Sequence, residues 1–127
     1  MKRYRIIVIQ EAEDDLLDIW SYIAANDSAG KADHVLTQLE VLCENLSTTP
    51  FRGHVCPELE PIGVSNYREV HFKPYRVIYE VAGKAVYVHA VLDGRRDLPS
   101  LLERRFTRPQ KINKRSTLSA FQPSRLD

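Results

Sequence analysis

The chain has 127 residues, of which 43% are hydrophobic, and a formal net charge of +1. This length fits one domain of ordinary size, and this apolar share is enough to build a core. Two cysteines cannot form a disulfide framework, and the N-terminal apolar run is too short for a signal peptide or a membrane span, so we expect a cytoplasmic protein without membrane contact.

The first 46 residues predict a strand followed by two helices. Residues 3–9, RYRIIVI, are rich in β-branched side chains, which favour a strand. Two apolar stripes at helical spacing follow, and Asp27 and Ser28 are candidate caps of the second helix, which should run from about residue 29 to 46. The stripes are Ala12, Leu16, Ile19, Trp20 and Ile23, and then Ala32, Val35, Leu36, Leu39, Leu42, Cys43 and Leu46. We expect a helical hairpin on an apolar surface, with Cys43 as a small core residue.

Three strands are predicted after a long connection. Residues 47–66 contain three prolines and two glycines and show no hydrophobic period, so we expect them to cross the surface as a loop. Alternation with a period of two then predicts strands at 67–72, 75–81 and 86–92, joined by short turns. The order β-α-α-β-β-β predicts a single α+β domain, in which the helical hairpin packs on a small, mainly antiparallel sheet.

Alternation along these strands assigns their side chains to two faces of the sheet. The face under the helices should hold Val70, Phe72, Val77, Tyr79, Val86, Val88, Ala90 and Leu92. The opposite face should hold Tyr67, Glu69, His71, Arg76, Ile78, Glu80, Tyr87, His89 and Val91. The polar side chains of this second face could perform general acid and base catalysis on a phosphodiester. They could equally form cross-strand ion pairs, such as Arg76 with Glu69 or Glu80.

Neither a metal nor another cofactor is predicted. His54 and Cys56 are near neighbours in the sequence, but a closed zinc site needs four ligands. The other histidines, His34, His71 and His89, show no ligand-like spacing to that pair.

Residues 91–98, VLDGRRDL, place fixed positive charge at the end of the last predicted strand. Arg95 and Arg96 follow an Asp-Gly bend and precede a Leu-Pro step, which favours a new helical turn in PSLLERRF. Two guanidinium groups held there suit a carboxylate or a phosphate. Either Arg95 and Arg96, with Asp97 and Leu98, contact a partner, or the arginines are tied within the chain to Asp97 or to the acidic helices.

Charge is distributed unevenly along the chain. Residues 11–46 carry nine acidic residues and one basic residue, whereas residues 66–96 carry six basic and three acidic residues. Residues 107–127 have few apolar side chains and no period, so we expect a basic, disordered tail after a folded domain at 1–106. Such a tail could add unspecific affinity for nucleic acid, or it could be an incidental extension.

Several segments, in this order and spacing, resemble the RelE/ParE superfamily of toxins from type II toxin-antitoxin systems. The resemblance covers residues 4–106 and rests on the strand, the acidic helical hairpin, and the segments GHVCPEL (53–59), YRVIYEV (75–81) and VLDGRRDL (91–98). The PEL and GRRDL parts are more similar to ParE than to RelE. The resemblance implies a toxin that a cognate antitoxin wraps and holds inactive, so that toxin-antitoxin hetero-oligomers are expected.

One branch of the superfamily, the RelE-like toxins, cuts messenger RNA on the ribosome with basic side chains and a proton-transferring group near the C-terminus. Here the candidates for that catalysis are His71, Arg76, His89 and Arg96. The C-terminal tyrosine of that branch aligns with Leu102, which has no proton to give, and its lysine positions fall near Glu69 and His71. A carboxylate there would repel the phosphate instead of stabilising its developing charge.

The other branch, the ParE-like toxins, binds DNA gyrase and traps its cleaved complex with DNA, which requires a binding surface but no catalytic set. The residues expected to contact a partner are Arg76, Arg95, Arg96, Asp97 and Leu98. We therefore predict a ParE-like gyrase inhibitor. The alternatives are a RelE-like, ribosome-dependent endoribonuclease and a non-toxic binding module.

Overall fold

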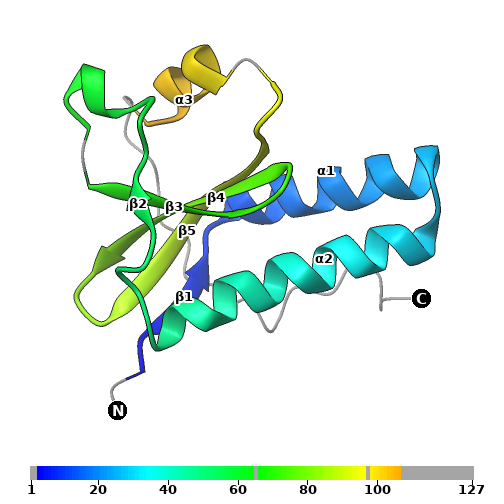
Figure 1. Cartoon of the computed structure of the whole chain (residues 1–127), viewed down its shortest axis with the longest axis horizontal. Helices are drawn as coiled ribbons and strands as arrows, with labels where there is room; N and C mark the ends of the chain where they lie inside the picture. The colour runs from blue at the N-terminus through cyan, green and yellow to red at the C-terminus, as the bar shows by residue number, and fades with distance from the viewer. Residues whose placement is uncertain (1–2, 65, 97, 107–127) are drawn as a thin grey trace.

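The computed structural model describes residues 3–64, 66–96 and 98–106. These residues form a five-stranded mixed sheet and three α-helices (Figure 1), which confirms the α+β class expected from the sequence. Within the described residues, no helix is long and apolar enough to cross a membrane. The predicted basic tail, 107–127, lies outside the described residues.

The predicted helical hairpin is present, with α1 at Gln10–Asn26 and α2 at Ala29–Glu44. Ser28 caps α2, because its hydroxyl accepts a hydrogen bond of 3.0 Å from the backbone N–H of Lys31. The two helices run side by side (Figure 1), and the indole N–H of Trp20 on α1 donates a 2.8 Å hydrogen bond to Asp33 on α2. The buried members of the two apolar stripes are Ala12, Leu16, Ile23, Ala32, Val35, Leu36, Leu39, Cys43 and Leu46, the last of which lies just after α2.

The sheet has the strand order β1-β5-β4-β3-β2. Strand β1 (Arg5–Val8) runs parallel to β5 (Ala85–Asp93), whereas β5 pairs antiparallel with β4 (Tyr75–Ala82), and β4 with β3 (Tyr67–Phe72). These bounds agree closely with the three strands predicted after residue 66. Gly83 makes the turn between β4 and β5 with a φ of 60°, a backbone conformation that favours glycine.

One further strand lies in the segment predicted to be a loop. Strand β2 (His54–Val55) pairs antiparallel with β3 at the edge of the sheet, with His54 opposite Glu69. The chain also forms two 3₁₀ turns, at Asn45–Ser47 and Glu60–Ile62. A strand of two residues is too short for its alternation to be visible in a sequence, so the loop prediction is wrong at this point.

An irregularity in β5 changes the predicted faces of the sheet. The register between β4 and β5 shifts after Ile78 and leaves His89 as an extra residue in β5. One extra residue reverses the alternation of the side chains beyond it. Ala90 and Leu92 therefore belong to the cluster on the far side of the sheet, and Val91 lies in the core under α1 and α2, opposite to the faces predicted for these three residues.

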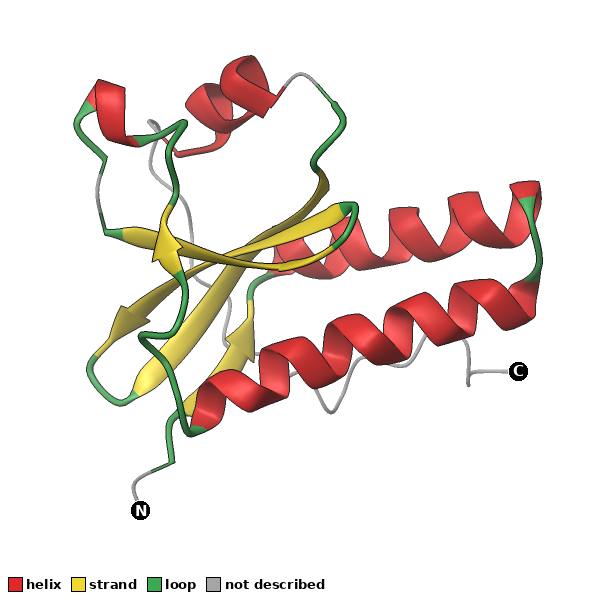
Figure 2. Cartoon of the chain, viewed as in Figure 1, coloured by secondary structure: helices red, strands yellow, loops and turns green. Residues whose placement is uncertain are grey.

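The far side of the sheet carries a second apolar cluster and a third helix. Helix α3 (Leu98–Phe106) extends the helical turn predicted after the Leu-Pro step, although the predicted element order omitted it. Figure 2 shows the two long helices on one side of the sheet and α3 on the other. The buried residues of this cluster are Cys56, Leu59, Ile78, Ala90, Leu92, Leu102 and Phe106. The second face is therefore a minor core, with polar groups at its margin.

A largely buried ion pair links α3 to α1. The Asp15 carboxylate on α1 lies 3.3 Å from both terminal nitrogens of Arg105 on α3, and it accepts a 2.9 Å hydrogen bond from the backbone N–H of Val91. Arg105 also donates a 2.8 Å hydrogen bond to the backbone carbonyl of His89. Burial outweighs these favourable contacts and raises the pKa of Asp15 from 3.8 to about 6.

The raised pKa of Asp15 predicts a stability that falls as the pH rises. The folded protein holds the Asp15 proton more tightly than the unfolded chain, so the stabilisation is complete below about pH 4 and is lost as pH passes through about 6. We expect the difference in unfolding free energy between wild type and Asp15→Asn to change by roughly 3 kcal/mol between about pH 4 and pH 7. Urea unfolding followed by circular dichroism measures it. Asp14→Asn, at an exposed position on the same helix, serves as the control. If the difference in unfolding free energy between wild type and Asp15→Asn did not change with pH, the argument from burial would be contradicted.

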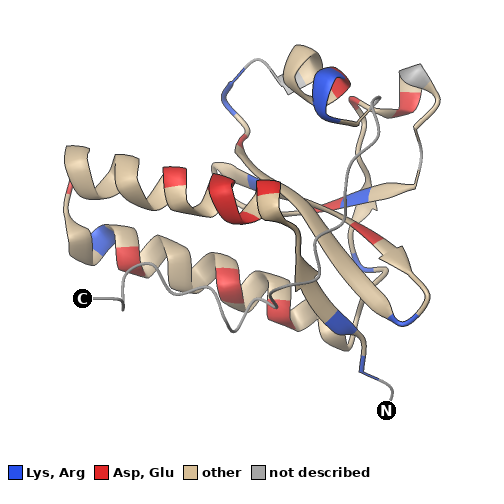
Figure 3. Ribbon diagram, turned by 180° about the vertical axis from the view of Figure 1, so that it is seen from behind, with Lys and Arg blue, Asp and Glu red and all other residues tan. Residues whose placement is uncertain are grey.

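Figure 3 shows the charge segregation expected from the sequence. Acidic residues lie along both long helices, where Lys31 is the single basic residue, while α3 carries Arg104 and Arg105 in its last turn. The molecule therefore presents an acidic helical hairpin.

Candidate functional site

The segment that follows β5, residues 94–96, is called here the arginine loop. Its first residue is a glycine for a steric reason, because a Cβ at position 94 would lie 3.0 Å from the backbone oxygen of Pro74. The backbone N–H of Gly94 donates a 2.7 Å hydrogen bond to that same oxygen. The Asp-Gly bend predicted from the sequence is thus present, and it ties the arginine loop to the turn between β3 and β4.

Arg95 is held by the residue that ends β5. Its Nε and Nη2 atoms lie 2.9 and 2.6 Å from the two carboxylate oxygens of Asp93, which makes a bidentate pair. Hydrogen bonding to Arg95 lowers the pKa of the Asp93 carboxyl. The Arg95 side chain is nevertheless 72% exposed. An intramolecular tie exists for Arg95, and among the described residues its partner is Asp93 and not an acidic helix.

Arg96 differs from its neighbour. It is exposed, and among the described residues no hydrogen bond or ion pair engages its guanidinium group, although its charge contributes to the lowered pKa of Asp93. Asp97 lies outside the described residues, and of Leu98 only the backbone, at the start of α3, is described. Of the two arginines in this loop, Arg96 is the one whose charge is available to a partner.

A hollow of about 400 Å³ lies between α1 and the arginine loop. Tyr22, which lines this hollow, is 69% exposed, and Ile19 and Tyr75 supply further apolar surface. Charged side chains of both signs complete the lining, namely Asp15, Asp18, Asp93, Arg95 and Arg96. Exposed aromatic and aliphatic surface beside arginines is the composition typical of protein-binding surfaces.

The Arg76 side chain, on β4, lies between two carboxylates. Its Nη1 and Nη2 atoms contact the two oxygens of Glu58 at 2.7 and 2.6 Å, and its Nε donates to Glu69 Oε1 at 2.7 Å, with Nη2 also bonded to that oxygen. The side chain of Arg76 is only 12% exposed and that of Glu69 only 3%. Hydrogen bonds with Arg76 lower the pKa of Glu58, and those with Glu58 raise the pKa of Arg76 further.

These three residues, Glu58, Glu69 and Arg76, are called here the Arg76 cluster. Of the two ion pairs predicted for Arg76, the one with Glu69 is present, whereas Glu80 pairs with His89 instead. Glu58 is a partner that the sequence did not reveal. Because both carboxylates bind the guanidinium group, the charge of Arg76 is neutralised within the chain.

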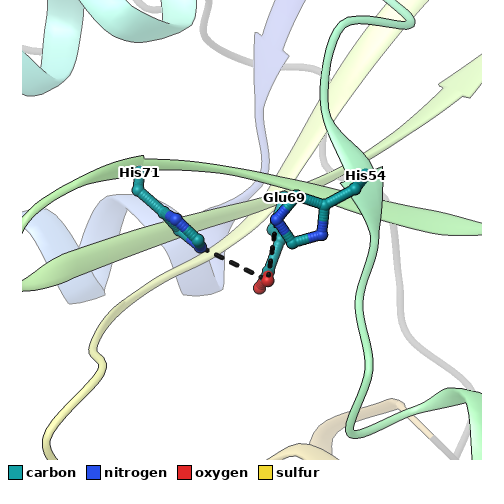
Figure 4. A group of neighbouring side chains, drawn as sticks. All are labelled: His54, Glu69 and His71. Carbon is teal, nitrogen blue, oxygen red and sulfur yellow. Dashed lines mark ion pairs between the residues drawn. The ribbon is translucent and has the colours of Figure 1, made fainter.

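Two histidines converge on the same glutamate. Figure 4 shows His54 from β2 and His71 from β3 on either side of Glu69. The Nε2 atoms of His54 and His71 lie 3.5 and 3.3 Å from Glu69 Oε2. This arrangement follows from the register, because His54 pairs with Glu69 across the strands and His71 lies two residues further on the same face of β3.

His89 does not join His54, Glu69 and His71, because it is buried elsewhere in the sheet. Its side chain is almost fully buried, its Nε2 atom lies 3.2 Å from Glu80, and its ring packs edge-on against Tyr67 at a centroid distance of 5.0 Å and near Phe106 at 5.9 Å. Leu102, where the tyrosine of the RelE-like branch aligns, is fully buried in the second apolar cluster. Neither residue reaches a surface where a substrate could bind.

The structure thus brings together only part of the residues predicted for RNA cleavage. His71 and Arg76 lie opposite each other on β3 and β4, whereas His89 lies under α3 and Arg96 in the arginine loop. The sequence missed His54 and Glu58 as neighbours of these residues. Their positions depend on the pairing of β2 with β3 and on the path of a loop, and neither leaves a periodic signal.

Comparisons with known proteins agree with this fold. A family model described as the ParE toxin of type II toxin-antitoxin systems, parDE, matches residues 6–98. The toxin ParE3 of Caulobacter vibrioides is 28% identical over 98 residues, which cover 77% of this chain and 94% of that protein. A solved structure described as the chromosomal ParDE toxin-antitoxin system from P. aeruginosa has a TM-score of 0.60 at 16% identity, covering 70% of this chain and 94% of the other.

The family model spans the strands, the helical hairpin and the arginine loop, which are the elements that carried the resemblance in the sequence. The resemblance to the RelE/ParE superfamily, and to its ParE branch, is therefore confirmed. The chain belongs to the family of ParE toxins of type II toxin-antitoxin systems.

Proposed function

We propose that this toxin acts in the cytoplasm by binding DNA gyrase and trapping its cleaved complex with DNA, and that a cognate antitoxin neutralises it. Membership of the ParE family supports gyrase as the target, because that is the activity implied by the ParE-like branch. The ParDE system named for the structural relative supports an antitoxin as the partner.

The two carboxylates that bind Arg76 are the main observation against RNA cleavage. A catalytic cation must face the phosphate whose charge develops in the transition state. In this chain Glu58 and Glu69 already bind the guanidinium group of Arg76. A phosphate would have to displace one of these carboxylates and would be repelled by the other. Leu102 has no proton to give and, like His89, is buried, so neither residue can transfer a proton to a substrate at the surface.

A gyrase inhibitor of this kind needs only contacts that favour the cleaved state. A ligand shifts a conformational equilibrium by the difference in its affinity for the two states, so binding surface alone is sufficient. The arginine loop and the hollow beside it supply an exposed cation at Arg96 together with the exposed ring of Tyr22. The proposed function is tested most directly by measuring whether gyrase joined covalently to cleaved DNA accumulates when the toxin is added.

Purified toxin is expected to leave messenger RNA intact, whether free or in translating ribosomes, because two carboxylates neutralise Arg76 and both His89 and Leu102 are buried. Primer extension on a translated message measures this, with a RelE-like toxin as the positive control. Cuts linked to codon position, lost on His71→Ala, would show that the endoribonuclease alternative is correct.

Antitoxin binding has its own expected result. The product of the neighbouring gene should copurify with the toxin from cells that express both genes, and it should relieve the growth inhibition that the toxin causes. A toxin that elutes alone from that preparation, and does not slow growth when expressed by itself, would contradict the proposed toxin-antitoxin pairing.

A further inference from the structure

Three potential ligand atoms from two strands converge at one edge of the sheet. The Nε2 atoms of His54 and His71 and a carboxylate oxygen of Glu69 all lie within 4.8 Å of one another. Each histidine nitrogen lies 3.3 to 3.5 Å from Glu69 Oε2. Two ligands bound to zinc at about 2.0 to 2.2 Å in tetrahedral geometry are separated by roughly 3.3 to 3.5 Å. Two edges of such a coordination shell are thus already formed.

Outer contacts hold two of these three ligand groups, His54 and Glu69, in place. His54 Nδ1 lies 3.2 Å from the backbone oxygen of Val55, and a donor at Nδ1 leaves Nε2 as the free lone pair that binds a metal. Arg76 bonds only to Oε1 of Glu69, so Oε2 stays available on the side of the histidines. Carboxylates and histidines held by such outer contacts are typical of protein metal sites.

We propose that His54, Glu69 and His71 bind a divalent transition metal ion, for which zinc is the best fit, through two imidazole nitrogens and one carboxylate oxygen. The fourth position faces solvent, because the side chains of His54 and His71 are 64% and 40% exposed. Exposed rings can also rotate by the small amount needed to close the third edge. Such a site has the open coordination typical of accessible, rather than structural, zinc sites.

A second group of potential ligands lies nearby but is less suited to a metal. Cys56, Glu58 and Glu69 also lie within 4.8 Å of one another. The Cys56 sulfur is itself engaged in this group, because it lies 3.7 Å from Glu58 Oε1 and 3.7 Å from Arg76 Nη2. The guanidinium of Arg76 already occupies the oxygens of Glu58. The histidine group is therefore the one that binds the ion.

This site has no counterpart among the sequence-based expectations, and the proposal reverses the prediction that the chain holds no metal. The two histidines are separated by sixteen intervening residues, and only the pairing of β2 with β3 places them on either side of Glu69. The proposal is independent of the target of the toxin, since it rests on the edge of the sheet and not on the arginine loop.

The test is zinc binding to the full-length chain, purified without a histidine tag and treated with a chelator. Calorimetric titration with ZnCl₂ should give one ion per chain with a dissociation constant in the micromolar range or below. Excess zinc should raise the melting temperature by about 5 °C or more, and the chelator should reverse the shift. CoCl₂ should give the visible absorption bands of tetrahedral cobalt.

Single substitutions test whether the two histidines are the zinc ligands. His54→Gln and His71→Gln should each weaken zinc binding at least about tenfold and abolish the thermal shift. His34→Gln, at an exposed position on α2, is the matched control and should bind as wild type does. Circular dichroism checks that each variant is folded. Absence of saturable binding by wild type, or equal binding by all three variants, would overturn the proposal.

Discussion

Replacing Arg76 by alanine is expected to lower the free energy of unfolding by about 3 to 5 kcal/mol, the cost of leaving a buried charge without its partner. Glu69 is almost fully buried and Glu58 partly so, and the guanidinium group binds both negative charges. Removing it leaves two carboxylates close together in a site of low polarity, where each favours protonation or water entry. Urea unfolding at neutral pH, followed by far-ultraviolet circular dichroism, measures this loss.

Two comparisons make the experiment specific to the Arg76 cluster. Arg52→Ala, at an exposed position in the loop before β2, should change the unfolding free energy by less than about 0.5 kcal/mol. The triple variant Glu58→Gln, Glu69→Gln, Arg76→Met removes all three charges and should recover much of the loss, because buried ion pairs can be replaced by neutral groups at small cost. A loss below about 1 kcal/mol for Arg76→Ala would mean that water, and not Arg76, stabilises the two carboxylates.

Replacing Arg96 by alanine is expected to raise the toxin concentration for half-inhibition of gyrase supercoiling at least about tenfold, as for a charged side chain that is desolvated on binding. Arg96 is exposed, and its charge is not neutralised by a described neighbour, so it can bind a phosphate or a carboxylate of the gyrase-DNA complex. The assay is ATP-dependent supercoiling of relaxed plasmid, with circular dichroism to confirm that the variant is folded.

Arg95→Ala is the matched comparison within the same loop. Because Arg95 is bound at both ends of its fork by Asp93, its loss should reduce potency less than the loss of Arg96 does. Deletion of residues 107–127 controls for unspecific attraction of the basic tail to DNA, and this variant should keep most of its potency. Full potency of Arg96→Ala together with an inactive tail deletion would move the contact from the arginine loop to the tail.

The helices and strands could be predicted from the sequence wherever a long period exists. The stripes of α1 and α2 and the alternation in β3, β4 and β5 are strong signals, and the Asp-Gly bend before Arg95 carries its own turn chemistry. Strand β2 and the extra residue at His89 have no such signal. Both depend on pairing with a neighbouring strand, which local sequence does not specify.

The sequence could predict which residues belong to the candidate site, but not which contacts they make. Arg95 and Arg96 look equivalent in the sequence, yet Asp93 binds one and leaves the other exposed. Arg76 aligned with a catalytic cation, yet Glu58 from a distant loop neutralises it. Which charge is available to a partner depends on these long-range contacts. The periodicity of a strand carries no information about them.

Poisoning of DNA gyrase by this ParE toxin is tested most directly by a cleavage assay with purified components. Wild-type toxin, gyrase, ATP and supercoiled plasmid are incubated, the reaction is stopped with detergent, and protein linked to linear DNA is measured with and without the cognate antitoxin. We expect covalent gyrase-DNA complexes to accumulate with toxin and to disappear when antitoxin is added first. Gyrase that turns over normally, with no covalent complex at any concentration of folded toxin, would contradict the proposed function.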